Sequence, residues 1–302
     1  MANFISPLQM NFTPAKQMDI QGDFINCTFI PNTDYLMLTQ AKHRGIYLYD
    51  LNSNKLKMIT EDYGAGYRPG ISEDGNRIVY KATSQNLYRL FAFDLEENNT
   101  TELRPSSNLI GQPWISKRGN IYVNYEGQLQ VLSPDGELKD IIGGIKSNIV
   151  IMTPSEEYLI YTSLSDQLWI YRFKDKKHIQ LTPDGMRFFS PLPSPTKEQI
   201  VANQLGGSIY VIDIPKGTLT EIDRGDYYYF SPDGEGIFFT KTTDDGEYIT
   251  SGELYYKPIK GEKSKKLEVG YKGIKLASSY NKKWGLAFVT DKGSVYLSSN
   301  RK

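Results

Sequence analysis

The sequence predicts an all-β fold made of seven repeated four-stranded units, and three observations support this prediction. The 302-residue chain contains 13% aromatic residues, including 22 tyrosines, and such bulky flat side chains fit pleated, half-buried strands. Its 26 glycines and 15 prolines are spread along the whole chain, as expected for many short turns. A short strand with alternating apolar residues recurs at spacings of 39 to 45 residues, which is typical of a four-stranded repeat unit.

The recurring strand fixes the phase of the repeat. It reads GIYLYDL in the first unit and SVYLSSN in the last. Seven copies span the chain, so we expect one repeat domain that covers residues 1–302. The first apolar position of the strand is occupied by Ile46, Leu90, Leu129, Leu168, Ile209, Leu254 and Val295.

The tetrapeptide SPDG occurs twice but does not itself mark the repeat. Ser231–Gly234 lies between the first and second strands of its unit, whereas Ser133–Gly136 follows a third strand. Proline sets φ and glycine accepts a positive φ, so the motif is a tight turn that suits both places.

A fourth strand follows in six of the units, and the seventh unit ends at Lys302 without one. The segment Ala15–Ile20 is a spare strand, and we expect it to pair onto the last unit and close the array. Closure removes sheet edges that an open array would leave unpaired. The sequence therefore predicts a seven-bladed β-propeller of four-stranded blades, closed by an N-terminal strand that completes the last blade. A six-bladed propeller, with the irregular last unit as a cap, is the alternative.

This repeat resembles that of the TolB-like and WD-type propellers. Their unit runs from an aromatic residue through Ser-Pro-Asp-Gly into an apolar strand, then to an Ile/Leu-Tyr strand that ends in Asp-Leu, and on to a glycine-containing turn. Here YFSPDGEGIFF starts at Tyr229, IYLYDL at Ile46 and IYVIDIPKGTLTEI at Ile209. The resemblance covers nearly the whole chain and implies the propeller fold. Propellers of this type serve as protein-docking platforms, as gating domains beside hydrolases and occasionally as enzymes, so the resemblance leaves the function open.

The sequence offers few groups for catalysis or metal binding. Its two histidines, His43 and His178, are expected on opposite rims, and a histidine metal site needs two or three that converge. No G-x-S-x-G motif, phosphate-binding loop or dinucleotide fingerprint occurs. The acidic stretch Asp244–Glu247 lacks the spacing of a calcium loop. We therefore expect no catalytic residue, no metal site and no cofactor.

Charge and cysteine usage limit the possible partners and location. Lysine plus arginine and aspartate plus glutamate number 35 each, without the basic excess of a nucleic-acid binder. The single Cys27 cannot form an intrachain disulfide. No signal peptide is visible at the N-terminus and no apolar run is long enough to span a membrane, so we expect a cytoplasmic protein unless a leader is missing.

The loops that join consecutive units carry the candidate binding residues. In a propeller these loops share a face with the hairpins between second and third strands. They bring tyrosine, tryptophan, arginine and lysine together, which are residue types typical of binding surfaces. The candidate set is Tyr67, Arg68, Trp114, Lys146, Arg187, Asp226, Tyr227, Tyr271 and Lys272.

Two functions fit this surface. The first is a non-catalytic propeller scaffold that binds a protein or peptide partner on the aromatic and basic rim. The alternative is a propeller that binds a carbohydrate or small anion, including a glycoside hydrolase or lyase that uses carboxylates in the central pocket. The scarcity of histidine favours the first, but a carboxylate pair would suffice for a glycosidase, so enzyme activity stays open.

Overall fold

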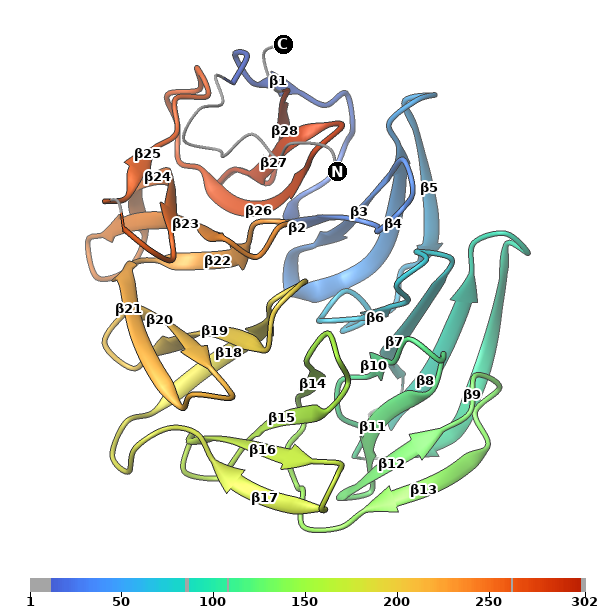
Figure 1. Cartoon of the computed structure of the whole chain (residues 1–302). Coiled ribbons are helices and arrows are strands. Elements are labelled where there is room, and N and C mark those ends of the chain that lie inside the picture. The colour runs from blue at the N-terminus through green and yellow to red at the C-terminus, as the bar shows by residue number, and fades with distance from the viewer. Residues whose placement is uncertain (1–11, 85–86, 108, 262, 300–302) are drawn as a thin grey trace. The chain divides into compact units, whose positions relative to one another are not determined.

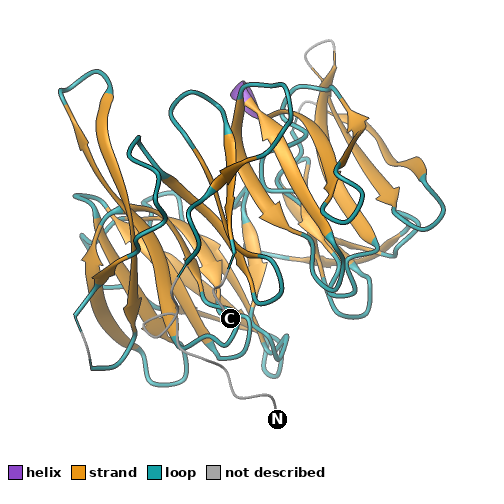
Figure 2. Cartoon of the chain, turned by 90° about the horizontal axis from the view of Figure 1, so that it is seen from above, coloured by secondary structure: helices purple, strands orange, loops and turns teal. Residues whose placement is uncertain are grey.

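The computed structural model describes residues 12–84, 87–107, 109–261 and 263–299, and strands form nearly all of their regular structure (Figure 2). One 3₁₀ turn, Ala41–His43, interrupts the strands. The strands form seven antiparallel sheets of four strands each (Figure 1). The fold is a seven-bladed β-propeller, as the sequence predicts, and the six-bladed alternative is wrong. The chain divides into two compact units, the central unit Phe29–Asp184 and the terminal unit Met1–Thr28 with Gly185–Lys302.

Four sheets follow one another in the first part of the chain. The first contains β2 (Phe24–Phe29), β3 (Tyr35–Gln40), β4 (Arg44–Asp50) and β5 (Lys55–Thr60). The second contains β6 (Gly70–Ile71), β7 (Arg77–Ser84), β8 (Leu87–Asp94) and β9 (Asn99–Ser107). The third contains β10 (Trp114–Ile115), β11 (Ile121–Tyr125), β12 (Gln128–Leu132) and β13 (Leu138–Ile142). The fourth contains β14 (Val150–Met152), β15 (Tyr158–Thr162), β16 (Leu168–Arg172) and β17 (Lys177–Gln180).

Three further sheets complete the chain. The fifth contains β18 (Phe188–Pro193), β19 (Gln199–Gln204), β20 (Ser208–Asp213) and β21 (Thr218–Arg224). The sixth contains β22 (Asp226–Phe230), β23 (Gly236–Asp244), β24 (Ile249–Pro258) and β25 (Lys265–Lys266). The seventh contains β26 (Leu276–Asn281), β27 (Gly285–Val289) and β28 (Val295–Ser298), with β1 (Lys16–Gln17) as its fourth strand.

The pairing of β1 with β28 confirms the expected closure. Lys16 lies opposite Leu297 and Gln17 opposite Tyr296 in an antiparallel register. The amide of Met18 extends the pairing by donating to Val295 O at 3.0 Å. Strand β1 thus supplies the outer strand that the last blade lacks.

Apolar side chains that alternate along the second and third strands form the core. On β4, Ile46 and Leu48 are completely buried. Between the third and fourth sheets, Leu129, Val150 and Leu159 belong to one cluster, so neighbouring sheets pack face to face. Full burial of one such side chain stabilises the fold by about 1.5–3 kcal/mol, which explains why these positions define the repeat.

The SPDG turn makes the same kinds of hydrogen bond at both of its places, although the serine hydroxyl accepts from a residue five positions along the chain at Ser231 and four positions along at Ser133. Ser231 Oγ accepts from Gly236 N at 3.0 Å and donates to Asp233 Oδ1 at 2.5 Å, and Gly234 adopts a φ of 70°. At the other copy Ser133 makes the matching bond from Glu137 N at 3.0 Å, between the third and fourth strands. The motif is therefore a local turn and not the repeat itself, as expected.

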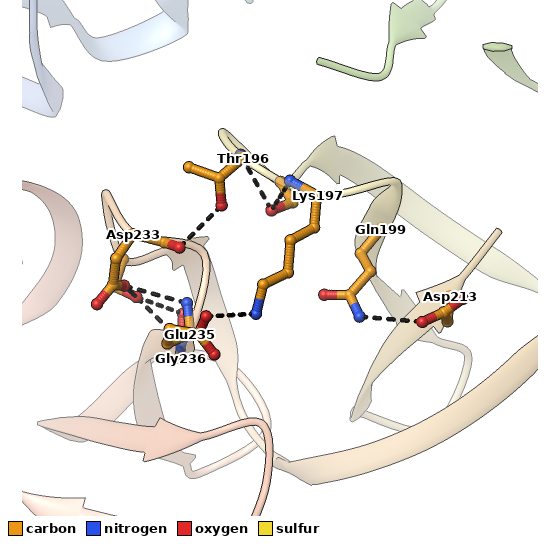
Figure 3. Close-up of polar contacts among 9 residues, drawn as sticks. Thr196, Lys197, Gln199, Asp213, Asp233, Glu235 and Gly236 are labelled. Carbon is orange, nitrogen blue, oxygen red and sulfur yellow. Dashed lines mark hydrogen bonds and ion pairs between the residues drawn. The ribbon is translucent and has the colours of Figure 1, made fainter. Parts of the chain in front are cut away.

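In the terminal unit, this turn also connects two neighbouring blades (Figure 3). Thr196 Oγ1 donates to Asp233 O at 2.8 Å, and Lys197 Nζ lies 2.6 Å from a Glu235 carboxylate oxygen. Gln199 Nε2 in turn donates to Asp213 at 3.3 Å within its own blade. The polar side chains of the first-to-second-strand turns thus hold adjacent blades together at this edge.

The seventh unit departs from the predicted turn position. In the register of the other units, the sequence SSYNKK at residues 278–283 predicts the turn between the first and second strands, but β26 continues through Ser278 to Asn281. The side chain of Asn281 instead accepts from Lys283 N at 2.8 Å and Trp284 N at 3.2 Å. Because asparagine rather than serine stabilises this turn, the serine signal used in the other blades is misleading here.

Candidate functional site

Each blade has two edges with different connections. The rim edge carries the hairpins between second and third strands and the loops to the next blade, whereas the turn edge carries the turns between first and second and between third and fourth strands. In the central unit the rim edge is formed by residues 41–43, 61–69, 109–113, 126–127, 143–149 and 163–167. In the terminal unit it is formed by residues 185–187, 205–207, 225, 245–248, 267–275 and 290–294.

Half of the exposed large apolar side chains of the described residues lie in the loops of the rim edge. Twelve such side chains occur among the described residues, and four of them, Leu56, Met58, Leu138 and Ile141, lie on the outermost strands β5 and β13. None lies in a described turn of the turn edge. The remaining eight are Tyr63, Tyr67, Leu87, Leu109 and Leu164 in the central unit and Leu205, Tyr227 and Tyr248 in the terminal unit.

Hydrogen bonds link the rim loops of the central unit into a continuous arc. His43 O accepts from Gly66 N at 3.1 Å, and Gln112 N donates to Asn148 O at 2.7 Å. The amide of Gln112, oriented to satisfy both of its ends, also donates to Tyr67 O at 2.7 Å and accepts from Lys81 Nζ at 2.9 Å. Side chains on successive blades are thus fixed relative to one another within this unit.

Lys81 stabilises the arc through hydrogen bonds to the loop between the second and third blades. Its Nζ donates to Ile110 O at 3.0 Å and lies 4.6 Å from the ring centre of Tyr88. Burial lowers the pKa of Lys81. The residue is a structural tie between the second and third blades, because its donors are directed to loop acceptors.

The start of the arc is an aromatic and basic cluster around β4 and the following loop. The His43 ring lies 4.7 Å from that of Tyr67, and the Arg44 guanidinium lies 5.5 Å from the ring centre of Tyr63. Tyr63 is 53% exposed. Burial lowers the pKa of His43, which keeps the imidazole neutral near pH 7. The nearby Gly66 has no room for a side chain, since a Cβ would lie 1.7 Å from Thr39 Oγ1.

A left-handed backbone residue recurs in or just before the first strand of three blades. Arg68, Ser190 and Tyr227 have φ values of 49°, 52° and 50°. Each precedes by four residues the serine that opens the next turn, so they occupy the same place in their blades. Non-glycine residues seldom adopt this conformation, and Ser190 and Tyr227 lie within the register shifts of β18 and β22. Two predicted binding residues, Arg68 and Tyr227, therefore have the same left-handed backbone conformation at the same place in their blades.

Trp114 and Lys146 have different surroundings. Trp114 starts β10, pairs with Tyr122 and packs against the core between the third and fourth sheets. Lys146 is exposed on the loop 143–149 and lines a pocket of about 380 Å³. The first residue therefore supports the core, whereas the second is available to a ligand.

That pocket also contains His178, which the sequence placed on the opposite rim from His43. The imidazole reaches from β17 toward the rim loop, because a Cβ on Gly144 would lie 3.3 Å from its Nε2. His178 Nδ1 is 2.8 Å from the Tyr161 hydroxyl. The expectation of opposite rims is therefore wrong for the side chain of His178.

In the terminal unit, the structure brings Arg187 near the tip of the β19–β20 hairpin. Leu205 N donates to Arg187 O at 2.9 Å, and the Arg187 guanidinium lies 5.8 Å from the Phe189 ring centre. Asp226 accepts from Thr242 Oγ1 at 2.8 Å, and the adjacent Tyr227 is 44% exposed. These side chains are at the rim edge, as expected.

Tyr271 and Lys272 illustrate two outcomes for neighbouring rim residues. The Tyr271 ring lies 4.5 Å from Tyr296 and 6.0 Å from Phe288, at the border of the seventh-blade core. Lys272 is exposed. Tyr271 is therefore largely a packing residue, and Lys272 is the more accessible of the pair.

A second pocket, of about 590 Å³, opens at the turn edge of the central unit. Arg77 lines it and donates through Nη2 to Pro134 O at 2.6 Å. Lys117 and Glu73, which also line it, form an ion pair at 4.0 Å. Since charges of both signs meet here and pair, this pocket shows no preference for one ligand charge.

The residues that the structure describes contain neither a cluster of metal ligands nor a membrane-spanning helix. They contain no group of three or more histidine, cysteine, aspartate or glutamate side chains suited to hold a metal ion. No helix formed by them is long and apolar enough to cross a bilayer.

The leucines at hairpin tips and the His178 pocket are the features that sequence reasoning missed. Leu164 lies between serines in SLSDQ and Leu205 precedes two glycines in QLGG. A large apolar residue inside a tight polar turn has no core to enter, and this signal could have identified both.

Comparison with known proteins supports the fold. No protein-family model and no curated protein matches the sequence. Among solved structures, the chain is similar to the β-propeller domain of Cps50 (Swd1) from Myceliophteria thermophila, with a TM-score of 0.67 and 12% identity over 96% of this chain and 99% of that one. It also matches TolB from Acinetobacter baumannii with a TM-score of 0.47 and 15% identity, covering 91% of this chain and about half, 54%, of that one. The match to the Cps50 propeller domain and the seven four-stranded sheets confirm the propeller fold that the TolB-like and WD-type resemblance implied.

Proposed function

We propose that the protein is a non-catalytic scaffold that binds a protein or peptide partner on the rim edge. The observation that carries this proposal is the placement of exposed apolar side chains, since six of the twelve lie in rim-edge loops and none lies in the described turns of the turn edge. Scattered exposed apolar residues are ordinary, but a bias to one kind of edge is typical of an interaction surface.

The chemistry of these side chains favours a polypeptide partner. Tyr63 and Tyr67 are exposed beside Arg44, and Tyr227 is exposed beside Asp226. Tyrosine and arginine contribute most at protein interfaces, because each combines a large apolar surface with hydrogen-bonding groups. The separate hairpin tips suit an extended contact better than one enclosed small molecule.

Three aspartates at the turn edge serve in turns and are poor candidates for the general acid of a glycosidase. Hydrogen bonds from the Ser53, Ser72 and Ser133 hydroxyls lower the pKa values of Asp50, Asp74 and Asp135, respectively. A glycosidase needs a carboxylic acid with a raised pKa as its general acid. These aspartates instead stabilise turns at the turn edge.

The proposal treats the whole chain, residues 1–302, as one functional domain in the cytoplasm. The matched propeller domain of Cps50 has nearly the same length, which supports the first part. Cys27 is a buried free thiol, which suits a reducing compartment. The balanced formal charge supports a protein partner in preference to nucleic acid.

Quantitative affinity capture with matched variants tests the proposal. We expect Tyr63→Ala with Tyr67→Ala to lose specific partners from a native extract, because both side chains are exposed at the rim edge. The control is Leu56→Ala with Met58→Ala, which removes two exposed apolar side chains from the outer strand β5 of the same unit.

Partners should be compared by mass spectrometry after both variants are shown to melt like the wild type. Loss in the rim variant with retention in the β5 control supports the proposal, and direct binding of the purified partner should then be measured. Equal capture by wild type and rim variant, together with a parallel Leu205→Ala, Tyr227→Ala variant that also keeps every partner, would refute it.

A further inference from the structure

The pocket beside His178 is a separate feature of the central-unit rim. It has a volume of about 380 Å³ and lies between the loop 143–149 and strands β15 to β17. Tyr161 and Trp169 stack with ring centres 6.5 Å apart, and the His178 ring meets Tyr161 edge-on at 5.8 Å. Its lining is Gly144, Lys146, Ser147, Tyr161, Thr162, Ser163, Leu164, Trp169 and His178.

The hydrogen bond between Tyr161 and His178 orients the imidazole. Tyr161 is buried, and its hydroxyl lies 2.8 Å from His178 Nδ1. When the tyrosine hydroxyl donates this bond, Nδ1 accepts and the ring proton resides on Nε2. This tautomer gives the pocket an N–H donor on the side of the ring that faces Gly144.

Trp169 and Lys146 add two further donors. The Trp169 indole Nε1 is buried and has no hydrogen-bond partner among the described residues, which is uncommon for a buried polar group and leaves an unused donor on a residue that lines the pocket. Lys146 is exposed and forms no ion pair within the described part of the chain.

The other polar side chains that line the pocket do not supply acceptors for these three donors. Ser147 Oγ donates to Ile149 O at 2.7 Å, and Ser163 Oγ donates to Gln167 Oε1 at 3.1 Å. No aspartate or glutamate occurs among the nine lining residues. The pocket therefore presents one cation and two N–H donors between aromatic walls, which is complementary to an anion carried on an apolar group.

We propose that this pocket binds the carboxylate of an aspartate or glutamate that is flanked by apolar residues in an extended peptide segment of the partner. The inference rests on the proposed docking function and names the chemistry of one part of it. Lys146, His178 Nε2 and Trp169 Nε1 are the donors to the carboxylate. Leu164, which is 92% exposed at the pocket mouth, contacts the apolar flank.

Peptide titration followed by NMR tests the inference without a known partner. The probe is the acetylated, amidated peptide Gly-Leu-Glu-Leu-Gly, and its uncharged match replaces Glu with Gln. The chain has three tryptophans, so its indole N–H region is simple, and Trp169→Phe assigns the relevant signal. We expect the Glu peptide to shift the Trp169 indole proton downfield and to bind roughly tenfold more tightly than the Gln peptide, because a charge-assisted bond is lost in the latter.

Variants locate the effect. Lys146→Ala and His178→Phe each remove one donor, and the second keeps a ring against Tyr161. The matched control is Lys174→Ala, an exposed lysine in the β16–β17 turn of the same blade but at the turn edge. We expect the preference for Glu over Gln to fall in both pocket variants and to persist in Lys174→Ala.

The outcomes separate this inference from the docking proposal. If the shift of the Trp169 indole proton requires the Glu peptide, Lys146 and His178, the pocket assignment is supported. This holds even if the Tyr63→Ala, Tyr67→Ala variant captures the same partners as the wild type. Equal affinity for both peptides, or binding that leaves the Trp169 indole unshifted, overturns it. If the capture then still depends on Tyr63 and Tyr67, only the pocket inference has failed.

Discussion

Replacing either of two adjacent tyrosines on β22, Tyr228 and Tyr229, by phenylalanine should change the stability of the protein in opposite directions. The Tyr228 hydroxyl accepts from Asn203 N at 2.9 Å and lies 2.9 Å from Ser190 O, so it joins β22 to the first two strands of the preceding blade. The Tyr229 hydroxyl is buried and has no hydrogen-bond partner among the residues that the structure describes. We predict that Tyr228→Phe destabilises the protein and that Tyr229→Phe stabilises it.

The magnitudes follow from the state of each hydroxyl. Removing the Tyr228 oxygen leaves the Asn203 amide without its acceptor, and an unsatisfied buried donor costs about 1–3 kcal/mol. Burying a hydroxyl without a partner costs a similar amount, about 1–3 kcal/mol, part of which Tyr229→Phe should recover. We therefore expect the free energies of unfolding of the two variants to differ by about 2–4 kcal/mol.

Urea unfolding followed by tryptophan fluorescence measures this difference. Both substitutions remove one oxygen from the same strand and keep the ring, so side-chain size cancels in the comparison. An unchanged dependence on urea concentration would show that the unfolded states are alike. If both variants shift the unfolding free energy in the same direction, or lie within about 0.5 kcal/mol of each other, a level typical of surface changes, then the hydrogen-bond assignment is wrong.

Three other predictions concern turns, acid stability and the thiol. Gly75→Ala should destabilise the protein by clearly more than Gly217→Ala, although both glycines have a positive φ. A Cβ on Gly75 would lie 2.0 Å from Pro31 O, whereas a Cβ on Gly217 would meet nothing within 4 Å. Equal melting temperatures of the two variants would contradict this prediction. Hydrogen bonds from Arg172 lower the pKa of Asp175 to about 2. Since this is below the ordinary value of about 3.9, the stabilising contribution of the pair is complete above about pH 4 and is lost as the pH falls toward about 2. Carboxyl NMR titration should find the low midpoint in the wild type and a rise in Arg172→Gln, and an unchanged midpoint would disprove the pairing. Burial raises the pKa of Cys27 to about 12, so iodoacetamide at about pH 8 should spare the native thiol and modify it in urea; rapid modification of the native protein would show that the site opens.

The blade architecture can be predicted from sequence because the repeat is set by burial. Ile46 and Ile209 occupy the same position in their blades and are both completely buried, and each continues a period that the chain repeats seven times. Closure by β1 follows from a count of strands, since a missing outer strand in one blade requires a spare one elsewhere. The position of the seventh turn cannot be obtained in this way, because Asn281 stabilises it through a side-chain bond that no repeat pattern specifies.

Exposure at the rim depends on the partner that each side chain meets, which the repeat position does not specify. Tyr67 and Tyr271 both lie in loops that join consecutive blades, yet Tyr67 contacts His43 and stays 36% exposed, whereas Tyr271 packs on Tyr296 and Phe288. Leu164 shows the reverse case. Its hairpin is closed by Ser163 and Gln167, whose backbone groups bond at 2.9 Å, so the leucine between them has no strand to pack against. An apolar residue at a hairpin tip is therefore a stronger indicator of an exposed rim side chain than an aromatic residue in a loop that enters the core.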